Sequence, residues 1–162
     1  SIMTTAEVPI AVVSLLAIGL IVRIKDNQRA LWVIHGLMFA GAALTGVATL
    51  LFQAEILGPA TWMICVGMGL YLGYVPINCV LFDRLIAAVG QAATAGFLIY
   101  VADASGYAGS VALMLYKNFG SPDLSWLSFF IQASYIMSIG CMLLFGASAL
   151  WFRRRTLSSN TA

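Results

Sequence analysis

The chain has 162 residues, of which 62% are hydrophobic and 9% are charged, with a mean hydropathy of +0.98 and a formal net charge of +2. An ordinary soluble domain is roughly half apolar and about a quarter charged, so this composition excludes a soluble globular domain and indicates an integral membrane protein. The small net charge does not indicate a nucleic-acid partner, and the three cysteines form no CxxC pair that would indicate a disulfide or zinc framework.

Five apolar stretches are long enough to cross the ~30 Å hydrocarbon core of a bilayer, which takes about 20 residues of helix. They predict an all-α polytopic bundle of five transmembrane helices over residues 1–156, followed by a polar, frayed cytoplasmic tail over 157–162. In chain order the predicted spans cover residues 6–23, 31–53, 60–82, 92–116 and 124–152. The first is near the lower length limit. Because the chain starts at Ser1 rather than Met, we expect a fragment or a processed chain.

Basic residues indicate the orientation of these spans. Seven of the eight lie after span one, after span three or in the tail, and Lys117 alone lies in a connection expected on the opposite side. Basic residues gather on the cytoplasmic side of a membrane, so we expect the N-terminus outside and the C-terminus in the cytoplasm. Tryptophans favour the membrane–water interfaces, and the four in this chain lie near predicted span ends: Trp32, Trp62, Trp126 and Trp151.

Span two carries the single histidine, His35, one turn inside its cytoplasmic end. We expect it at the interface rather than as a metal ligand or proton relay.

Span three places Tyr71, Tyr74 and Asn78 on one helical face, since residues three and four apart are neighbours. The same span contains Gly69-x-x-x-Gly73, a small-residue motif that suits close helix contact.

Pro76 interrupts the backbone hydrogen bonds of span three, so a carbonyl near Leu72 needs another partner. Two interpretations stay open, a gating kink beside a cavity and a static kink. Asp83 and Arg84 follow the span, where they are either cytoplasmic gate charges or a solvated helix end.

Asp103 is the charge that lies near the middle of an apolar stretch, in span four. An ionisable group at this depth costs about 2.5–3.5 kcal/mol on insertion scales. One face of span four carries Gly96, Tyr100, Asp103, Tyr107 and Ser110. Tyr71 and Tyr74 of span three reach a similar depth, so an acid and several phenols can meet at mid-membrane, where carriers hold substrates and coupling ions.

No Lys, Arg or His of the sequence shares the depth of Asp103. The acid can be protonated by desolvation, ionised in a wet cavity, or paired with a cation from other helices or from a substrate. A structural role, as a protonated acid hydrogen-bonded between helices, stays open beside the functional one.

The candidate residues fall into two groups. The substrate- or ion-binding candidates are Asp103, Tyr100, Tyr107, Tyr71, Tyr74 and Asn78, and the gating candidates are Pro76, Asp83 and Arg84. The sequence contains no nucleophile–base pair or metal-ligand cluster, so we expect neither an enzyme nor a cofactor.

Three strings, GYVPINCVLFDRLIAA, GFLIYVADASGYAGSVALMLYKNFG and LSWLSFF, resemble the C-terminal part of an uncharacterised bacterial family of major-facilitator-like membrane proteins. The resemblance is strongest over residues 73–130. It implies that the five spans are the last five of twelve in an inner-membrane protein, with spans one, three and four bordering a central cavity and spans two and five outside it. The implied partners are the lipid bilayer, N-terminal helices of the same protein, and a small solute with a proton or cation.

The sequence therefore predicts the C-terminal portion of a secondary transporter for an unknown small solute, with Asp103 as a proton- or cation-responsive site. The alternative is a non-transporting sensor or assembly subunit in which Asp103 forms a structural hydrogen bond between helices.

Overall fold

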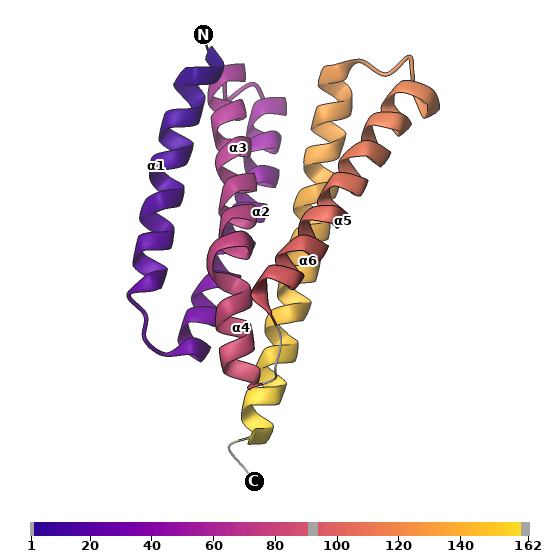
Figure 1. Cartoon of the computed structure of the whole chain (residues 1–162). Coiled ribbons are helices and arrows are strands. Elements are labelled where there is room, and N and C mark those ends of the chain that lie inside the picture. The colour runs from indigo at the N-terminus through magenta and orange to yellow at the C-terminus, as the bar shows by residue number, and fades with distance from the viewer. Residues whose placement is uncertain (1, 91–93, 160–162) are drawn as a thin grey trace.

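A computed structural model describes the backbone of residues 2–90 and 94–159, and the side chains of residues 7–90 and 94–153. Every regular element in these ranges is helical. In chain order they are α1 (Ile2–Val22), α2 (Asn27–Gln53), α3 (Pro59–Pro76), η1 (Ile77–Leu81), α4 (Phe82–Val89), α5 (Ala95–Leu115), η2 (Tyr116–Gly120) and α6 (Trp126–Ser159). The elements η1 and η2 are π-helical turns that continue the helices before them, so the chain forms five rods (Figure 1).

Four of the rods have the length and apolar composition of membrane spans: Asn27–Gln53, Pro59–Val89, Ala95–Gly120 and Trp126–Arg153. This confirms an all-α, multi-pass membrane protein. The described apolar part of the first rod, Glu7–Val22, is shorter than the other four. The last rod continues to Ser159 and so extends into the tail that we expected to be frayed, while residues 160–162 lie outside the described residues.

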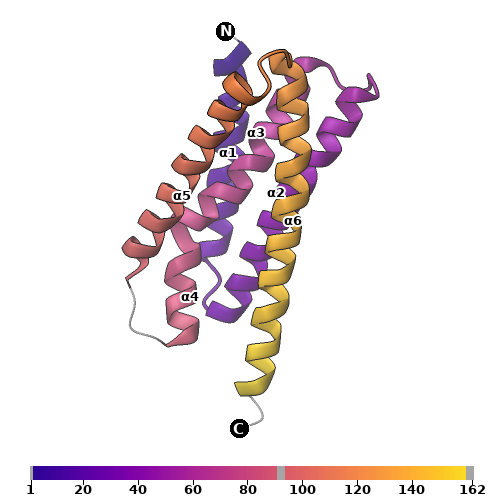
Figure 2. The ribbon, with the colours of Figure 1, turned by 90° about the vertical axis from the view of Figure 1, so that its right-hand side faces the viewer.

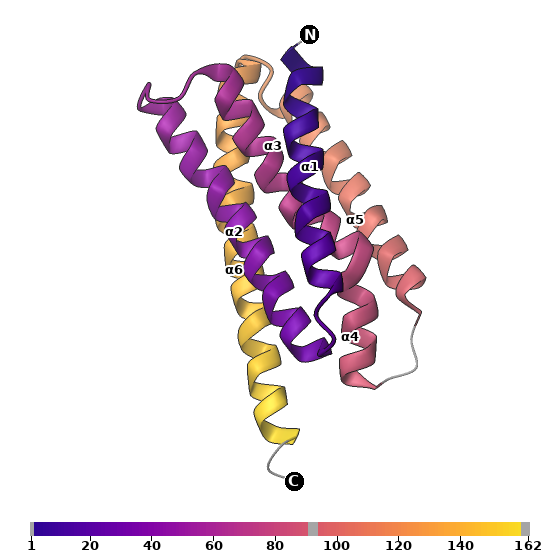
Figure 3. The ribbon, with the colours of Figure 1, turned by 90° about the vertical axis from the view of Figure 1, so that its left-hand side faces the viewer.

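The two ends of the bundle differ in charge. The α1–α2 connection, the end of α4 and the end of α6 lie at one end, which we call the arginine end (Figures 1 and 3). Its basic residues are Arg23, Lys25, Arg29, Arg84 and Arg153, followed by the arginines at 154 and 155. The N-terminus, the α2–α3 connection and the α5–α6 connection lie at the opposite end.

Lys117 is the basic residue of that opposite end, and it is buried. Its Nζ donates to the backbone carbonyls of Ser121 and Pro122, at 3.5 and 3.4 Å, and lies 5.1 Å from the ring centroid of Trp126. The ammonium therefore stabilises the turn between α5 and α6 through carbonyl dipoles and a cation–π contact.

The centre of the bundle is α2, which packs between α3 and α6. Half of the apolar window of α2 is buried, against none of that of α5, which lies at the edge of the bundle in Figure 2. Two apolar clusters hold the centre together. Ile21, Ile34 and Met38 form one, and Ala48, Trp62 and Val66 form the other.

Small residues let α2 and α3 approach closely. A Cβ atom built on Gly69 would lie 2.5 Å from the Gly41 carbonyl oxygen and would overlap the Thr45 hydroxyl. A Cβ on Gly73 would meet nothing within 4 Å. Both glycines of the predicted small-residue motif lie near Gly41, since a Cβ built on Gly41 would be 2.6 Å from the Gly69 carbonyl oxygen and 3.4 Å from the Gly73 nitrogen, but only the Cβ position of Gly69 is blocked by α2.

Trp62 shows that depth along a span does not determine which way a side chain faces. Its indole donates to the Thr49 hydroxyl at 3.2 Å and stacks on Phe52, with ring centroids 4.2 Å apart. The ring is buried between helices, because α2 presents both a partner for its polar N–H and an aromatic surface. Its expected depth near a membrane–water interface is a separate property and stays a prediction.

Candidate functional site

Tyr74 and Asp103 connect α3 to α5. The Tyr74 hydroxyl donates to Asp103 Oδ1 at 3.4 Å, which is longer than the 2.5–2.7 Å typical of a strong hydrogen bond to a carboxylate. Tyr74 is 57% exposed and Asp103 is partly buried. No basic side chain among the described residues lies within ion-pair distance of Asp103. The acid is therefore approached by a phenol and not by a cation.

The depth of this contact follows from its place in α5. Asp103 is eight residues beyond Ala95, or about 12 Å along the helix. The hydrocarbon core is ~30 Å thick, so the carboxylate lies near mid-span, as the sequence predicts.

The other tyrosine candidates surround this contact more loosely. Tyr107 follows Asp103 by one helical turn on α5, and it is 75% exposed. Tyr100 is 78% exposed and Tyr71 is also exposed, and neither forms a hydrogen bond within the described part of the chain. The structure therefore brings Tyr74 and Asp103 together, and it leaves Tyr107, Tyr100 and Tyr71 exposed on the surrounding surface.

Pro76 precedes a change in helical geometry. It ends α3, and η1 begins at the next residue as a π-helix, a form that often occurs at functional sites. The Asn78 side-chain amide donates to the Tyr74 carbonyl at 3.3 Å. The Tyr74 carbonyl also accepts from the backbone N–H of Ile77, and the expected freed carbonyl near Leu72 stays a prediction. Asn78 thus supports the backbone at the residue whose phenol meets Asp103.

The gating candidates Asp83 and Arg84 do not pair with each other. Arg84 Nη1 donates to Asn27 Oδ1 at 2.8 Å, which joins α4 to the first residue of α2. Asp83 is exposed in the first turn of α4. The bond from Arg84 therefore links the helix after the π-turn to the central helix of the bundle.

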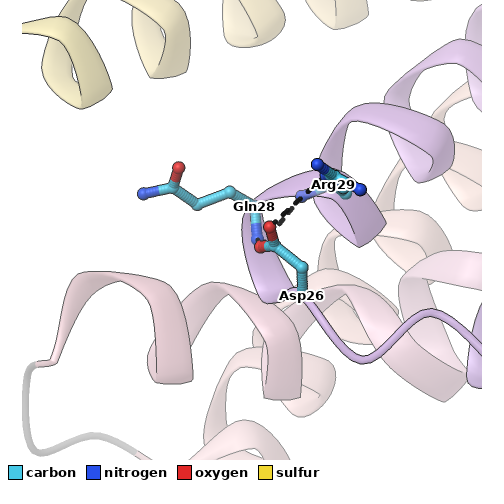
Figure 4. Close-up of polar contacts among 3 residues, drawn as sticks. All are labelled: Asp26, Gln28 and Arg29. Carbon is cyan, nitrogen blue, oxygen red and sulfur yellow. Dashed lines mark hydrogen bonds and ion pairs between the residues drawn. The ribbon is translucent and has the colours of Figure 1, made fainter.

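The start of α2 is held by its own cap, next to that bond. Asp26 Oδ1 accepts from the backbone N–H groups of Gln28 and Arg29, at 2.8 and 3.4 Å, and Oδ2 lies 3.6 Å from Arg29 Nε (Figure 4). An N-cap of this kind satisfies backbone donors that have no partner within the helix. The cap thus fixes the start of α2, where Asn27 accepts the hydrogen bond from Arg84.

A cavity of about 320 Å³ lies between α2, α3 and α6 and is partly open to the surface. It is lined by Met38, Ala42, Thr45, Gly69, Leu70, Gly73, Tyr74, Ile77, Met137, Ser138, Cys141 and Phe145. Tyr74 is the candidate residue that borders it. The resemblance implied a cavity beside spans one, three and four, whereas this one is bordered by spans two, three and five.

His35, which we expected near the cytoplasmic membrane–water interface, packs between α2 and α6. It is buried, with Nδ1 2.7 Å from the Leu31 carbonyl oxygen and Nε2 2.9 Å from the Ser148 hydroxyl on α6. The available signal was the spacing of His35, Met38, Ala42, Thr45 and Thr49, which lie on one face of α2 and are all buried. Within the described residues, no three His, Cys, Asp or Glu side chains gather into a metal-binding group.

Comparison with known proteins identifies a family but no characterised relative. The model of one protein family, described as "Family of unknown function (DUF5690)", matches residues 1–155. No curated protein and no solved structure matches the chain.

Proposed function

The chain belongs to the DUF5690 family, and we propose that it moves a small solute across a membrane as part of a secondary transporter. In this proposal Asp103 is the proton- or cation-responsive group, and Tyr74 positions it. The observation that carries the proposal is the contact between the Tyr74 hydroxyl and Asp103 Oδ1, 3.4 Å apart near mid-span.

No residue of α5 is buried. A carboxylate facing lipid at this depth costs about 2.5–3.5 kcal/mol on insertion scales. For the face that carries Asp103 and Tyr107, contact with water or with other protein is therefore more favourable than contact with lipid acyl chains. A water-filled pathway lets the acid exchange protons or cations, which is how midplane acids serve carriers.

The proposed orientation rests on the charges at the two ends of the bundle. With the arginine end in the cytoplasm, the N-terminus of the chain lies outside and its C-terminus inside. The resemblance to major-facilitator-like proteins further suggests a bacterial inner-membrane protein in which other helices of the same protein cover α5. These five rods would then be the last five of twelve.

The test measures whether water reaches the face of α5 that carries Asp103. Asp103→Cys and Tyr107→Cys are introduced singly into the full-length protein after Cys65, Cys79 and Cys141 are changed to serine. Val101→Cys is the matched control, because position 101 lies at nearly the same depth but about 200° around the helix from position 103.

We expect a membrane-impermeant, cationic methanethiosulfonate reagent to modify the cysteines at 103 and 107 at least tenfold faster than the one at 101. The Tyr107→Cys variant keeps the acid, so its rate does not depend on the loss of Asp103. Equally slow reaction at all three positions would rule out a water-filled pathway along this face.

A second candidate function is assembly with another membrane subunit, and the absence of buried residues in α5 favours it. In that case Asp103 forms a structural hydrogen bond across the interface. Asp103→Asn would then lower the assembly size measured by native mass spectrometry, and the cysteines at 103 and 107 would react as slowly as the one at 101.

A further inference from the structure

The cavity between α2, α3 and α6 presents almost entirely apolar walls at mid-span. Its large side chains are Met38, Leu70, Ile77, Met137 and Phe145. The two aliphatic hydroxyls that border it are already used within the protein, since Ser138 donates to the Ala42 carbonyl at 2.7 Å and Thr45 to the Gly41 carbonyl at 3.1 Å. These walls therefore favour the binding of an apolar group and leave few hydrogen-bonding partners for a polar one.

Tyr74 joins this apolar space to the acid. The residue lines the cavity, and its hydroxyl is 3.4 Å from Asp103 Oδ1 on the neighbouring helix. Tyr74 therefore contacts both the apolar cavity and a carboxylate that does not itself line the cavity and has no ion-pair partner within the described residues.

We propose that the cavity and Asp103 together bind an amphipathic organic cation, with its apolar body between α2, α3 and α6 and its ammonium group beside Asp103 and Tyr74. The inference rests on the proposed transport function and names its substrate class. The cavity volume of about 320 Å³ falls at the lower end of the 300–1,000 Å³ typical of ligand pockets.

Charge complementarity selects a cation over other ligands. An ammonium group neutralises the carboxylate at a depth where an unpaired charge is costly, and the electron-rich face of Tyr74 attracts the same group. A neutral apolar molecule leaves the acid unpaired, and an anion is repelled by it. Lipid ammonium groups stay at the membrane surface, so a free amphipathic amine reaches Asp103 more readily than a headgroup does.

The test uses three probes that share a benzyl body: benzyltrimethylammonium, its neutral isostere neopentylbenzene, and benzylsulfonate. Binding of each probe to the full-length protein is measured in phosphatidylglycerol nanodiscs, with empty nanodiscs as background. We expect the cation to bind at least tenfold more tightly than the neutral isostere, and the sulfonate to bind more weakly than both. Equal affinity for the cation and the isostere would overturn the proposal.

Two variants separate the cavity from the acid. Asp103→Asn should remove the preference for the cation while the neutral probe still binds. Gly73→Leu should weaken the binding of the cation and of the neutral isostere at least tenfold, because Gly73 lines the cavity and a Cβ there meets nothing within 4 Å. Gly19→Leu is the matched control, since Gly19 on α1 also has open space and lies outside the cavity. A preserved cation preference in Asp103→Asn, or unchanged binding in Gly73→Leu, would show that the site lies elsewhere.

A final arm separates a free amine from a lipid headgroup. Adding phosphatidylethanolamine to the nanodiscs should leave the affinity for benzyltrimethylammonium unchanged, whereas competition by this lipid would assign the site to a headgroup. The cysteine-labelling experiment gives an independent result. Fast labelling at positions 103 and 107 without cation binding would overturn this substrate class and leave the transport proposal standing.

Discussion

Gly41 on α2 lies so close to Gly69 on α3 that a Cβ atom built on Gly41 would be 2.6 Å from the Gly69 carbonyl oxygen. The opposing atom is backbone and cannot rotate away. This contact sets the distance between the central helix and the helix that carries Tyr74, and so determines where the candidate site can form.

Gly69→Ala should lower the free energy of unfolding by about 1–3 kcal/mol, the usual cost of overpacking a core. Gly73→Ala, one helical turn later, is the matched control. Its Cβ meets open space, and the change should raise stability by no more than about 1 kcal/mol through helix propensity. SDS titration of both variants in mixed micelles measures the difference. Equal stabilities would show that the close approach does not constrain the bundle.

His35→Ala should destabilise the protein by about 2–4 kcal/mol, because it removes a buried ring and leaves buried hydrogen-bonding atoms without partners. Ser148→Ala should cost about 1 kcal/mol. Because the two side chains are bonded at 2.9 Å, the double variant should lose less than the sum of the single variants.

Ser105→Ala is the control for the His35 cycle. The Ser105 hydroxyl is exposed and donates to the Val101 carbonyl of its own helix, so its loss should change stability by no more than about 0.5 kcal/mol. Additive effects of the His35 and Ser148 changes would mean that the bond does not couple α2 to α6.

Tyr74→Phe should change the free energy of unfolding by less than about 1 kcal/mol. Hydrogen bonds between transmembrane helices average about 0.6 kcal/mol in double-mutant cycles, and this one is long and partly exposed. A loss above about 2 kcal/mol would favour the structural role for Asp103 over the functional one. The same SDS titration decides between them.

Glu55→Cys and Lys25→Cys test the proposed orientation, in the background without native cysteines. Both positions are exposed and lie in connections at opposite ends of the bundle. In intact cells an impermeant maleimide should label the cysteine at 55, and it should label the one at 25 only after the cells are permeabilised. The reverse pattern would place the arginine end outside.

The sequence indicated the rods well, because the length of an apolar stretch and the cost of a buried charge are local properties. It also located Asp103 near mid-span and Tyr74 at a matching depth, and the structure brings these two within 3.4 Å. The same reasoning did not distinguish Tyr74 from Tyr71, which lies on the same predicted face but forms no hydrogen bond among the described residues. Helical periodicity shows which residues share one face of a helix, but it does not show which other helix that face contacts.

Tertiary packing decided what each face meets. The expected depth of His35 and Trp62 near the ends of their spans did not show that both rings are buried between helices. Trp62 bonds to Thr49, 13 residues away, and His35 bonds to Ser148, 113 residues away on α6. The π-helical turn after Pro76 is likewise a feature of the folded backbone, and the missing N–H of the proline does not predict it by itself.

By itself, then, the sequence determined the number of rods, the charge at their ends and the depth of the lone acid, all of which follow from the transfer of single residues between water and hydrocarbon. The tertiary structure alone decided that α2 is central, that α5 stays exposed, and that the cavity lies between α2, α3 and α6. These features of the packing depend on how closely glycines such as Gly41 and Gly69 let two helices approach. That distance depends on both helices together and cannot be read from either one alone.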